Sequence, residues 1–142
     1  MLSPLLLGTG LLFVSMLSFT VAIVLVVSLM SRVIRAGYSG ESFRKNVAIM
    51  IVITFVMAAA HLLEIALWAT AFCASGEVAT FDTAFYFSAV NYTSLGYGDI
   101  VLSDRWRLLG PLEAINGLLL FGLSTAVMFA VLSRLVASRL HS

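Results

Sequence analysis

The fold follows from one short stretch of sequence, Thr93-Ser94-Leu95-Gly96-Tyr97-Gly98-Asp99. Successive backbone carbonyls of a strand point in one direction only if its residues alternate between right- and left-handed conformations. Glycine reaches the left-handed region without a Cβ penalty, so Gly96 and Gly98 predict a strand of this kind. The strand would present a line of oxygens: the Ser94 hydroxyl and the carbonyls of Ser94, Leu95, Gly96 and Tyr97. One strand offers one oxygen per level, and the motif occurs once, so four chains around an axis are needed to replace a cation's hydration shell.

The residues before this stretch predict a short helix over 82–93, with Thr80 or Asp82 as its cap. Twelve helical residues reach only about 18 Å, which is too short to cross a bilayer. A short apolar helix followed at once by glycines is typical of a re-entrant segment. Such a segment is tolerated at membrane depth only where protein covers it or where it lines water.

The composition indicates an integral membrane protein. Of the 142 residues 61% are hydrophobic and 11% are charged, whereas soluble domains are about a quarter charged. A net charge of +1 gives no basic surface for nucleic acid. The single cysteine, Cys73, excludes an intrachain disulfide. No catalytic triad, HExxH, Walker or dinucleotide motif is present, so we expect neither an enzyme nor an organic cofactor.

Three stretches are long and apolar enough to span a bilayer as helices. They predict helices over 1–35, 46–73 and 112–135, and hence an all-α membrane protein with three transmembrane helices and one re-entrant helix. Two basic residues, Arg105 and Arg107, lie between the second and third spans. Six lie in the first connection or after the third span: Arg32, Arg35, Arg44, Lys45, Arg134 and Arg139. This bias predicts that the N-terminus is outside the cell and the C-terminus in the cytoplasm.

Residues 81 to about 135 resemble the potassium-channel pore family, whose filter signature is TVGYG followed by Asp. The stretch from Asn116 to Ala126 is similar to the glycine-hinged inner helix of bacterial two-helix potassium channels. The resemblance implies a homotetramer in the cell (inner) membrane that conducts K⁺ passively, with an extra first span and with a pore domain over 46–135. It implies that residues 94–98 coordinate K⁺. It also assigns filter support to Thr93, Asp99, Tyr86 and Val90, and it implies a hydrogen bond from Tyr86 on the short helix to Asp99.

The chain departs from the family pattern at three positions in or beside the filter. Ser94 replaces Thr, Leu95 replaces Val, and Val90 lies where some members carry a bracing carboxylate. Two alternatives to a potassium channel therefore stay open. The chain could form a weakly selective cation pore, or it could be a non-conducting membrane scaffold or regulatory subunit.

The last span carries residues with two interpretations each. Gly117 and Gly122 either hinge the helix for gating or allow close helix packing. Thr125 either lines a water-filled cavity or bonds to its own helix one turn back. Glu113 is expected at the external start of this helix, where a carboxylate suits the helix dipole.

His61 and Glu64 are the ionisable groups inside the spans, and their spacing places them on one helix face. We expect them to pair with each other, and with Arg107, Asp82 or Tyr86 as further candidate partners. Three roles stay open: a structural tie to the pore helix, a proton-sensitive tie that protonation of His61 strengthens, and a metal site.

Overall fold

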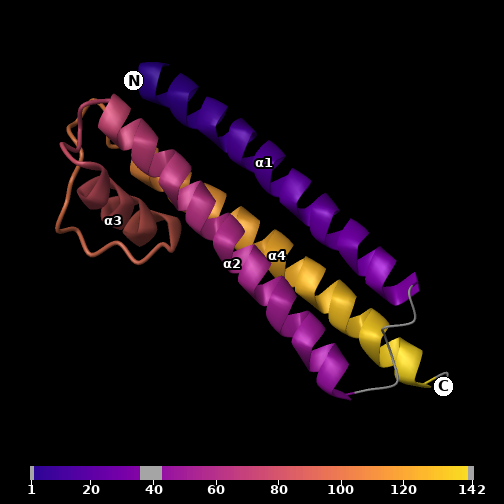
Figure 1. Ribbon diagram of the computed structural model, residues 1–142. Helices are drawn as coiled ribbons and strands as arrows, with labels where there is room; N and C mark the ends of the chain where they lie inside the picture. Colours follow the sequence, from indigo (N-terminus) through magenta and orange to yellow (C-terminus); the bar gives the residue numbers. More distant parts are fainter. Residues whose placement is uncertain (1, 36–42, 141–142) are drawn as a thin grey trace.

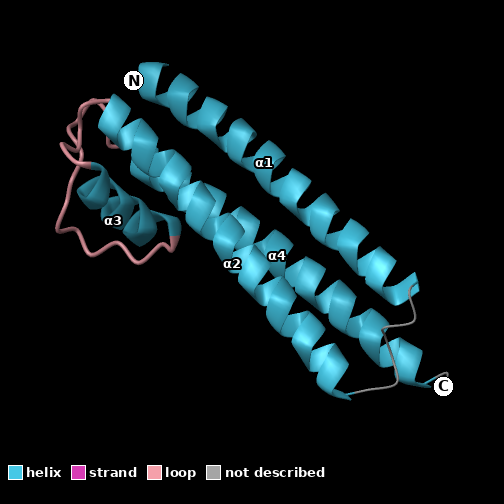
Figure 2. Cartoon of the chain, viewed as in Figure 1, coloured by secondary structure: helices cyan, strands magenta, loops and turns pink. Residues whose placement is uncertain are grey.

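A computed structural model describes residues 2–35 and 43–140, and this part of the chain is entirely helical and loop (Figure 2). Its helices are α1 (Leu2–Arg35), α2 (Phe43–Ala74), α3 (Phe81–Tyr92) and α4 (Leu109–Leu140). The predicted all-α class is confirmed. Met1 of the predicted first helix lies outside the described residues, as does the Arg139 side chain.

The predicted three membrane spans are confirmed. Leu2–Val33, Phe43–Ala74 and Leu109–Ala137 are each long and apolar enough to cross a bilayer. The spans of α2 and α4 begin three residues earlier than the sequence predicted. Both helices exceed the roughly 20 residues that a bilayer core requires.

The short helix α3 begins at the expected threonine. The Thr80 hydroxyl accepts a hydrogen bond from the Thr83 amide, and Asp82 lies in the first turn, where its charge suits the helix dipole. The helix has 12 residues and ends at Tyr92, directly before the glycine-rich strand. Because α3 is too short to span a bilayer and packs against α2 and α4, it has the geometry of a re-entrant helix.

The three long helices lie side by side, and α3 packs beside one end of the bundle (Figure 1). This end holds the start of α1, the end of α2 and the start of α4. The opposite end holds the end of α1, the start of α2 and the end of α4. The six basic residues named in the sequence analysis therefore belong to this end of the bundle.

Helix α1 packs against both α2 and α4, and among the described residues it makes no comparable contact with α3. Its buried side chains Phe19, Val26 and Met30 share one apolar core with side chains of α2 and α4. Near its start, Gly8 approaches α4 so closely that a Cβ there would lie 2.4 Å from a methyl of Leu112. The first span is therefore part of the folded subunit.

Candidate functional site

The segment 94–98 after α3 is an extended loop, called the filter strand below or simply the strand, and it alternates in backbone handedness as the sequence predicted. Ser94, Gly96 and Gly98 have φ values of +59°, +59° and +75°. Leu95 and Tyr97 between them are not left-handed. The left-handed conformation of Ser94 was not predicted, because serine gives no left-handed signal of its own and the conformation costs about 1–2 kcal/mol for a residue with a Cβ. Extending the two-residue period of the glycines backward would have found it.

Backbone hydrogen bonds tie the start of this strand to the last turn of α3. The amides of Leu95 and Gly96 both donate to the Val90 carbonyl, at 2.9 and 3.4 Å, and the Ser94 amide donates to the Asn91 carbonyl at 2.8 Å. These amides use carbonyls that a helix end would otherwise leave unpaired. Within the described residues no amide donates to the carbonyls of 94–97, which stay available to a ligand. Val90 thus holds the strand through its backbone oxygen.

The end of the strand is held from the outside by Tyr86. Its hydroxyl donates to Oδ2 of Asp99 at 2.7 Å, which confirms the hydrogen bond expected between these two residues. This bond to Asp99 is the main reason why the pKa of Tyr86 is raised above its ordinary value of 10.0. The phenol therefore stays protonated, and remains a donor, across the physiological range. Thr93 makes a different contact, since its hydroxyl donates to the Ala89 carbonyl of its own helix at 2.7 Å.

The strand is exposed on the surface of the single chain. Leu95 is 55% exposed and Tyr97 is 66% exposed, although both are large and apolar or aromatic. At membrane depth an exposed irregular strand is stable only when protein covers it or when it borders water. The geometry of one subunit therefore leaves a surface that further chains would have to complete.

Behind the strand, one histidine joins all four helices. Nδ1 of His61 lies 2.8 Å from the Tyr92 hydroxyl on α3, and Nε2 lies 2.8 Å from Oγ of Ser124 on α4. The imidazole also stacks between Phe19 of α1 and Phe121 of α4, with ring centroids 4.9 and 4.4 Å away. His61 thereby links the last residue of the re-entrant helix to the middle of α4.

The neighbours of His61 determine its tautomer. The Ser124 hydroxyl has one hydrogen, which it donates to the Leu120 carbonyl at 2.9 Å, so it can only accept from the imidazole. Nε2 of His61 must therefore carry the proton. In a neutral ring Nδ1 is then the acceptor, and the Tyr92 hydroxyl donates to it. The Tyr92 hydroxyl can also accept, so a protonated ring would keep both contacts with the direction of this one reversed.

The predicted pairing of His61 with Glu64 is wrong. The Glu64 carboxylate accepts from the Ser18 hydroxyl of α1 at 2.6 Å, and Glu64 is 4% exposed. Equal spacing on one helix face did not pair the two groups, because each finds hydrogen-bond partners on other helices: His61 on α3 and α4, and Glu64 on α1.

The partners proposed for this pair lie elsewhere. Arg107 forms an ion pair with Asp104 at 3.1 Å on the surface, and the Tyr86 hydroxyl donates to Asp99. Both ring nitrogens of His61 are engaged, and the described residues hold no group of three His, Cys, Asp or Glu side chains. The proton-sensitive tie that strengthens on protonation and the metal site therefore have no structural support.

A second buried acid was missed by the sequence analysis. Glu113 is 0% exposed, and its Oε1 lies 2.5 Å from the Ser88 hydroxyl on α3. The expected role as an external helix cap is wrong, because α4 begins at Leu109 and Glu113 points into the α3–α4 contact one turn later. The Ser88 hydroxyl is also 2.8 Å from the Ile65 carbonyl of α2, so this cluster joins three helices.

The structure supports different interpretations for the three residues singled out on the inner helix, Gly117, Gly122 and Thr125. A Cβ on Gly117 would lie 1.9 Å from the Tyr92 carbonyl oxygen, so close packing accounts for this glycine. Gly122 has open space around it within the chain, and a hinge there stays a prediction. The Thr125 hydroxyl bonds to the Phe121 carbonyl one turn back at 2.9 Å.

These features define a class: a small all-helical membrane protein that places a re-entrant helix and a strand of free carbonyls beside two of its long helices, α2 and α4. Comparison with protein families identifies the class more closely. Residues 49–134, more than half of the chain, match the model of a family described as ion channel, and the chain belongs to this family. The match includes α3, the strand and most of α2 and α4, and it leaves out α1. Comparisons with curated proteins and with solved structures found no match.

Proposed function

We propose that this ion channel is a potassium-selective homotetramer whose filter consists of residues 94–98 from four chains. One observation carries the proposal. The left-handed conformations of Ser94, Gly96 and Gly98 alternate along a strand whose first amides donate to carbonyls of α3, and in the described part of the chain no amide donates to the carbonyls of 94–97. Rings of backbone carbonyls replace the hydration shell of K⁺ in selective filters. K⁺ is the transported ion, and no other cofactor is needed.

The surroundings of the strand favour a cation over an anion. Helix α3 ends at the strand, and a helix C-terminus carries a partial negative charge of about half an electron. The last turn of α3 holds no basic side chain that would oppose this charge. Asp99 adds a carboxylate at the far end of the strand. An oxygen-lined path between two negative ends suits a cation.

The tetramer follows from what one chain lacks. A single strand provides one carbonyl per level, while four provide a full ring of ligands. The exposed Leu95 and Tyr97 side chains would be covered by neighbouring copies around the axis. We place the end of the bundle that carries α3 on the external side and the basic end in the cytoplasm, because six of the eight basic residues belong to that end. The chain then lies in the cell (inner) membrane, with its N-terminus on the external side.

A flux measurement on the purified full-length chain in liposomes tests the proposal. We expect K⁺ efflux that barium blocks, and a strong preference for K⁺ over Na⁺. Comparable K⁺ and Na⁺ flux would favour a weakly selective cation pore, in line with the larger Leu95 side chain. No flux from correctly inserted protein would favour a scaffold or regulatory subunit.

A matched pair of variants connects flux to the filter. Gly96 and Gly76 are both left-handed, with φ of +59° and +76°, and neither has a heavy atom within 4 Å of the position of a Cβ. Replacing either with Ala costs about 1–2 kcal/mol of backbone strain. We expect Gly96→Ala to abolish selectivity or conduction, and Gly76→Ala, in the loop after α2, to retain both. Equal behaviour of the two variants would contradict a filter at residues 94–98.

A further inference from the structure

A groove between α1 and α4 lies in the half of the bundle away from α3. It has a volume of about 310 Å³, and its lining is apolar except for Arg134. The α1 side contributes Ile23, Val27 and Met30, while Ala126 and Ala130 of α4 leave room between the helices. A groove of this kind requires α1, which lies outside the residues that match the ion channel family.

The basic end of the bundle gives this groove a charged rim. Arg134 is exposed, and within the described residues 2–35 and 43–140 its guanidinium forms no ion pair. Arg32 at the end of α1 is exposed too, and no acidic residue lies in the last turns of α1 or α4. The end of α1 and the end of α4 lie at the same end of the molecule (Figure 1). Arg134 thus provides an exposed positive charge in the lining of the apolar groove, and within residues 2–35 and 43–140 neither Arg134 nor Arg32 forms an ion pair.

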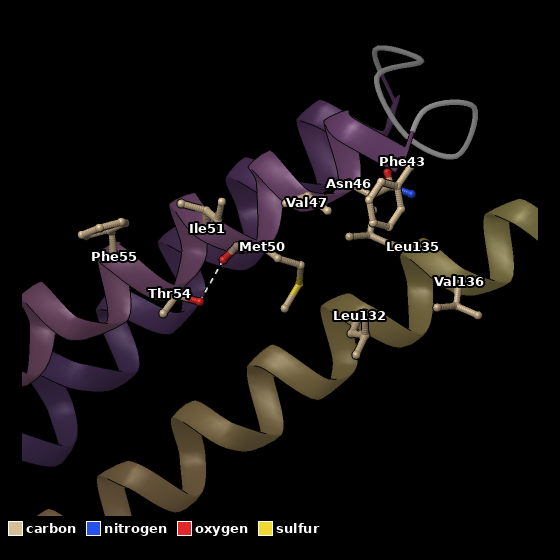
Figure 3. Close-up of a pocket in the computed structure, with 10 residues that line it drawn as sticks. All are labelled: Phe43, Asn46, Val47, Met50, Ile51, Thr54, Phe55, Leu132, Leu135 and Val136. Atoms are coloured by element: carbon tan, nitrogen blue, oxygen red, sulfur yellow. Dashed lines mark hydrogen bonds between the residues drawn. The ribbon is translucent and has the colours of Figure 1, made fainter.

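A second groove, between α2 and α4, lacks this combination. It measures about 400 Å³ and is lined by apolar side chains together with Asn46 and Thr54 (Figure 3). The Thr54 hydroxyl donates its hydrogen to the Met50 carbonyl of the same helix at 2.9 Å. No cationic side chain lines this groove, so its lining gives no preference for a charged ligand.

We propose that the α1–α4 groove binds an anionic phospholipid, with one acyl chain between the two helices and the headgroup phosphate at Arg134. Basic pockets between membrane helices at the cytoplasmic side bind anionic headgroups, and a guanidinium forms two parallel hydrogen bonds to phosphate. The apolar lining matches a hydrocarbon chain, and the charge at one end fixes its direction. The ligand is a membrane lipid with a net negative headgroup, such as phosphatidylglycerol.

Native mass spectrometry of the detergent-purified full-length chain, titrated with lipid, tests the site. The probes are phosphatidylglycerol and phosphatidylcholine with identical acyl chains. We expect the wild type to bind phosphatidylglycerol more tightly. Arg134→Gln should weaken phosphatidylglycerol about fivefold, or about 1 kcal/mol, and leave phosphatidylcholine unchanged. Arg134→Lys should retain most of the preference because it keeps the charge.

Two further variants separate this site from general surface charge. Arg105→Gln removes an exposed arginine at the opposite end of the bundle and should change neither lipid. Ala130→Phe fills the groove while keeping Arg134, and should weaken both lipids. Equal losses of phosphatidylglycerol in Arg134→Gln and Arg105→Gln would overturn the proposal. So would unchanged lipid binding in Ala130→Phe, and a change of oligomeric state in that variant without a lipid effect would assign the groove to a second copy of the chain.

Discussion

Replacing His61 with Phe tests whether the four-helix junction holds the filter in place. Phenylalanine keeps an aromatic ring between Phe19 and Phe121 but removes both hydrogen bonds. The Tyr92 hydroxyl, on a residue that is fully buried, then loses its acceptor, which costs about 1–3 kcal/mol. Ser124 keeps its bond to the Leu120 carbonyl and loses only the imidazole donor, for about 0.5–1.5 kcal/mol. We expect a loss of roughly 2–4 kcal/mol of unfolding free energy per subunit.

A double-mutant cycle isolates the bond between His61 and Tyr92. Removing the orphaned hydroxyl with Tyr92→Phe should restore part of the stability lost in His61→Phe, so the two losses will not add. Denaturation of the purified protein, followed by tryptophan fluorescence, measures the four free energies. Thr125→Val serves as the control, because that hydroxyl is exposed and bonds only to its own helix, and we expect a change within about 0.5 kcal/mol. Additive losses, or a His61→Phe variant as stable as the control, would refute the junction as described.

Three further variants probe the contacts around the filter. Tyr86→Phe removes the bond to Asp99 and should shorten channel openings without changing ion preference in single-channel recordings. Because the pKa of Tyr86 is raised above 10.0, the wild-type bond should persist from pH 7 to 9 and be lost only as the pH rises through that higher pKa; changes within that window would contradict it. Gly117→Ala forces a Cβ against the Tyr92 carbonyl and should cost about 1–3 kcal/mol or more, measured by thermal unfolding. Glu113→Gln, which keeps volume and hydrogen-bonding capacity, should stay within about 1 kcal/mol of wild type, while Glu113→Ala loses about 2–5 kcal/mol; equal losses would mean that the negative charge itself is required.

The membrane spans and the backbone alternation of the strand could be predicted because each depends on the residues within the segment itself. An uncharged apolar run of sufficient length forms a membrane helix wherever it occurs, so the three spans follow from composition alone. The alternation of the strand follows from Gly96 and Gly98, since glycine is the residue that the left-handed positions favour. The Tyr86–Asp99 bond was predicted through the resemblance to the potassium-channel pore family, which supplied a pairing that spacing alone does not give.

The contacts behind the filter could not be predicted from the sequence for a different reason. Spacing along a helix shows that His61 and Glu64 share a face, but it does not fix how that face is turned against three other helices. The rotation of α2 about its axis decides which neighbouring helices the two side chains face, and so whether the Ser18 hydroxyl is within reach of Glu64 and the Tyr92 hydroxyl within reach of His61. Glu113 was misplaced for a related reason, because its depth depends on where α4 begins, and helix boundaries are set by tertiary contacts as much as by local sequence.

Proton uptake at His61 would reverse its hydrogen bond with Tyr92, whereas the sequence predicted an effect on a bond to Glu64. Protonation turns Nδ1 into a donor, so the Tyr92 hydroxyl would accept from it and would lose the imidazole as the acceptor for its own hydrogen, while Ser124 still receives the other N–H. Tyr92 is the last residue of α3, and the strand is hydrogen-bonded to the same turn through the Val90 and Asn91 carbonyls. A change in the His61–Tyr92 bond would therefore act on the helix turn that holds the backbone proposed to bind the ion. Helix α1 takes part in the same junction, because Phe19 packs against His61. A span outside the family match therefore contacts a residue inside the matched region, 49–134.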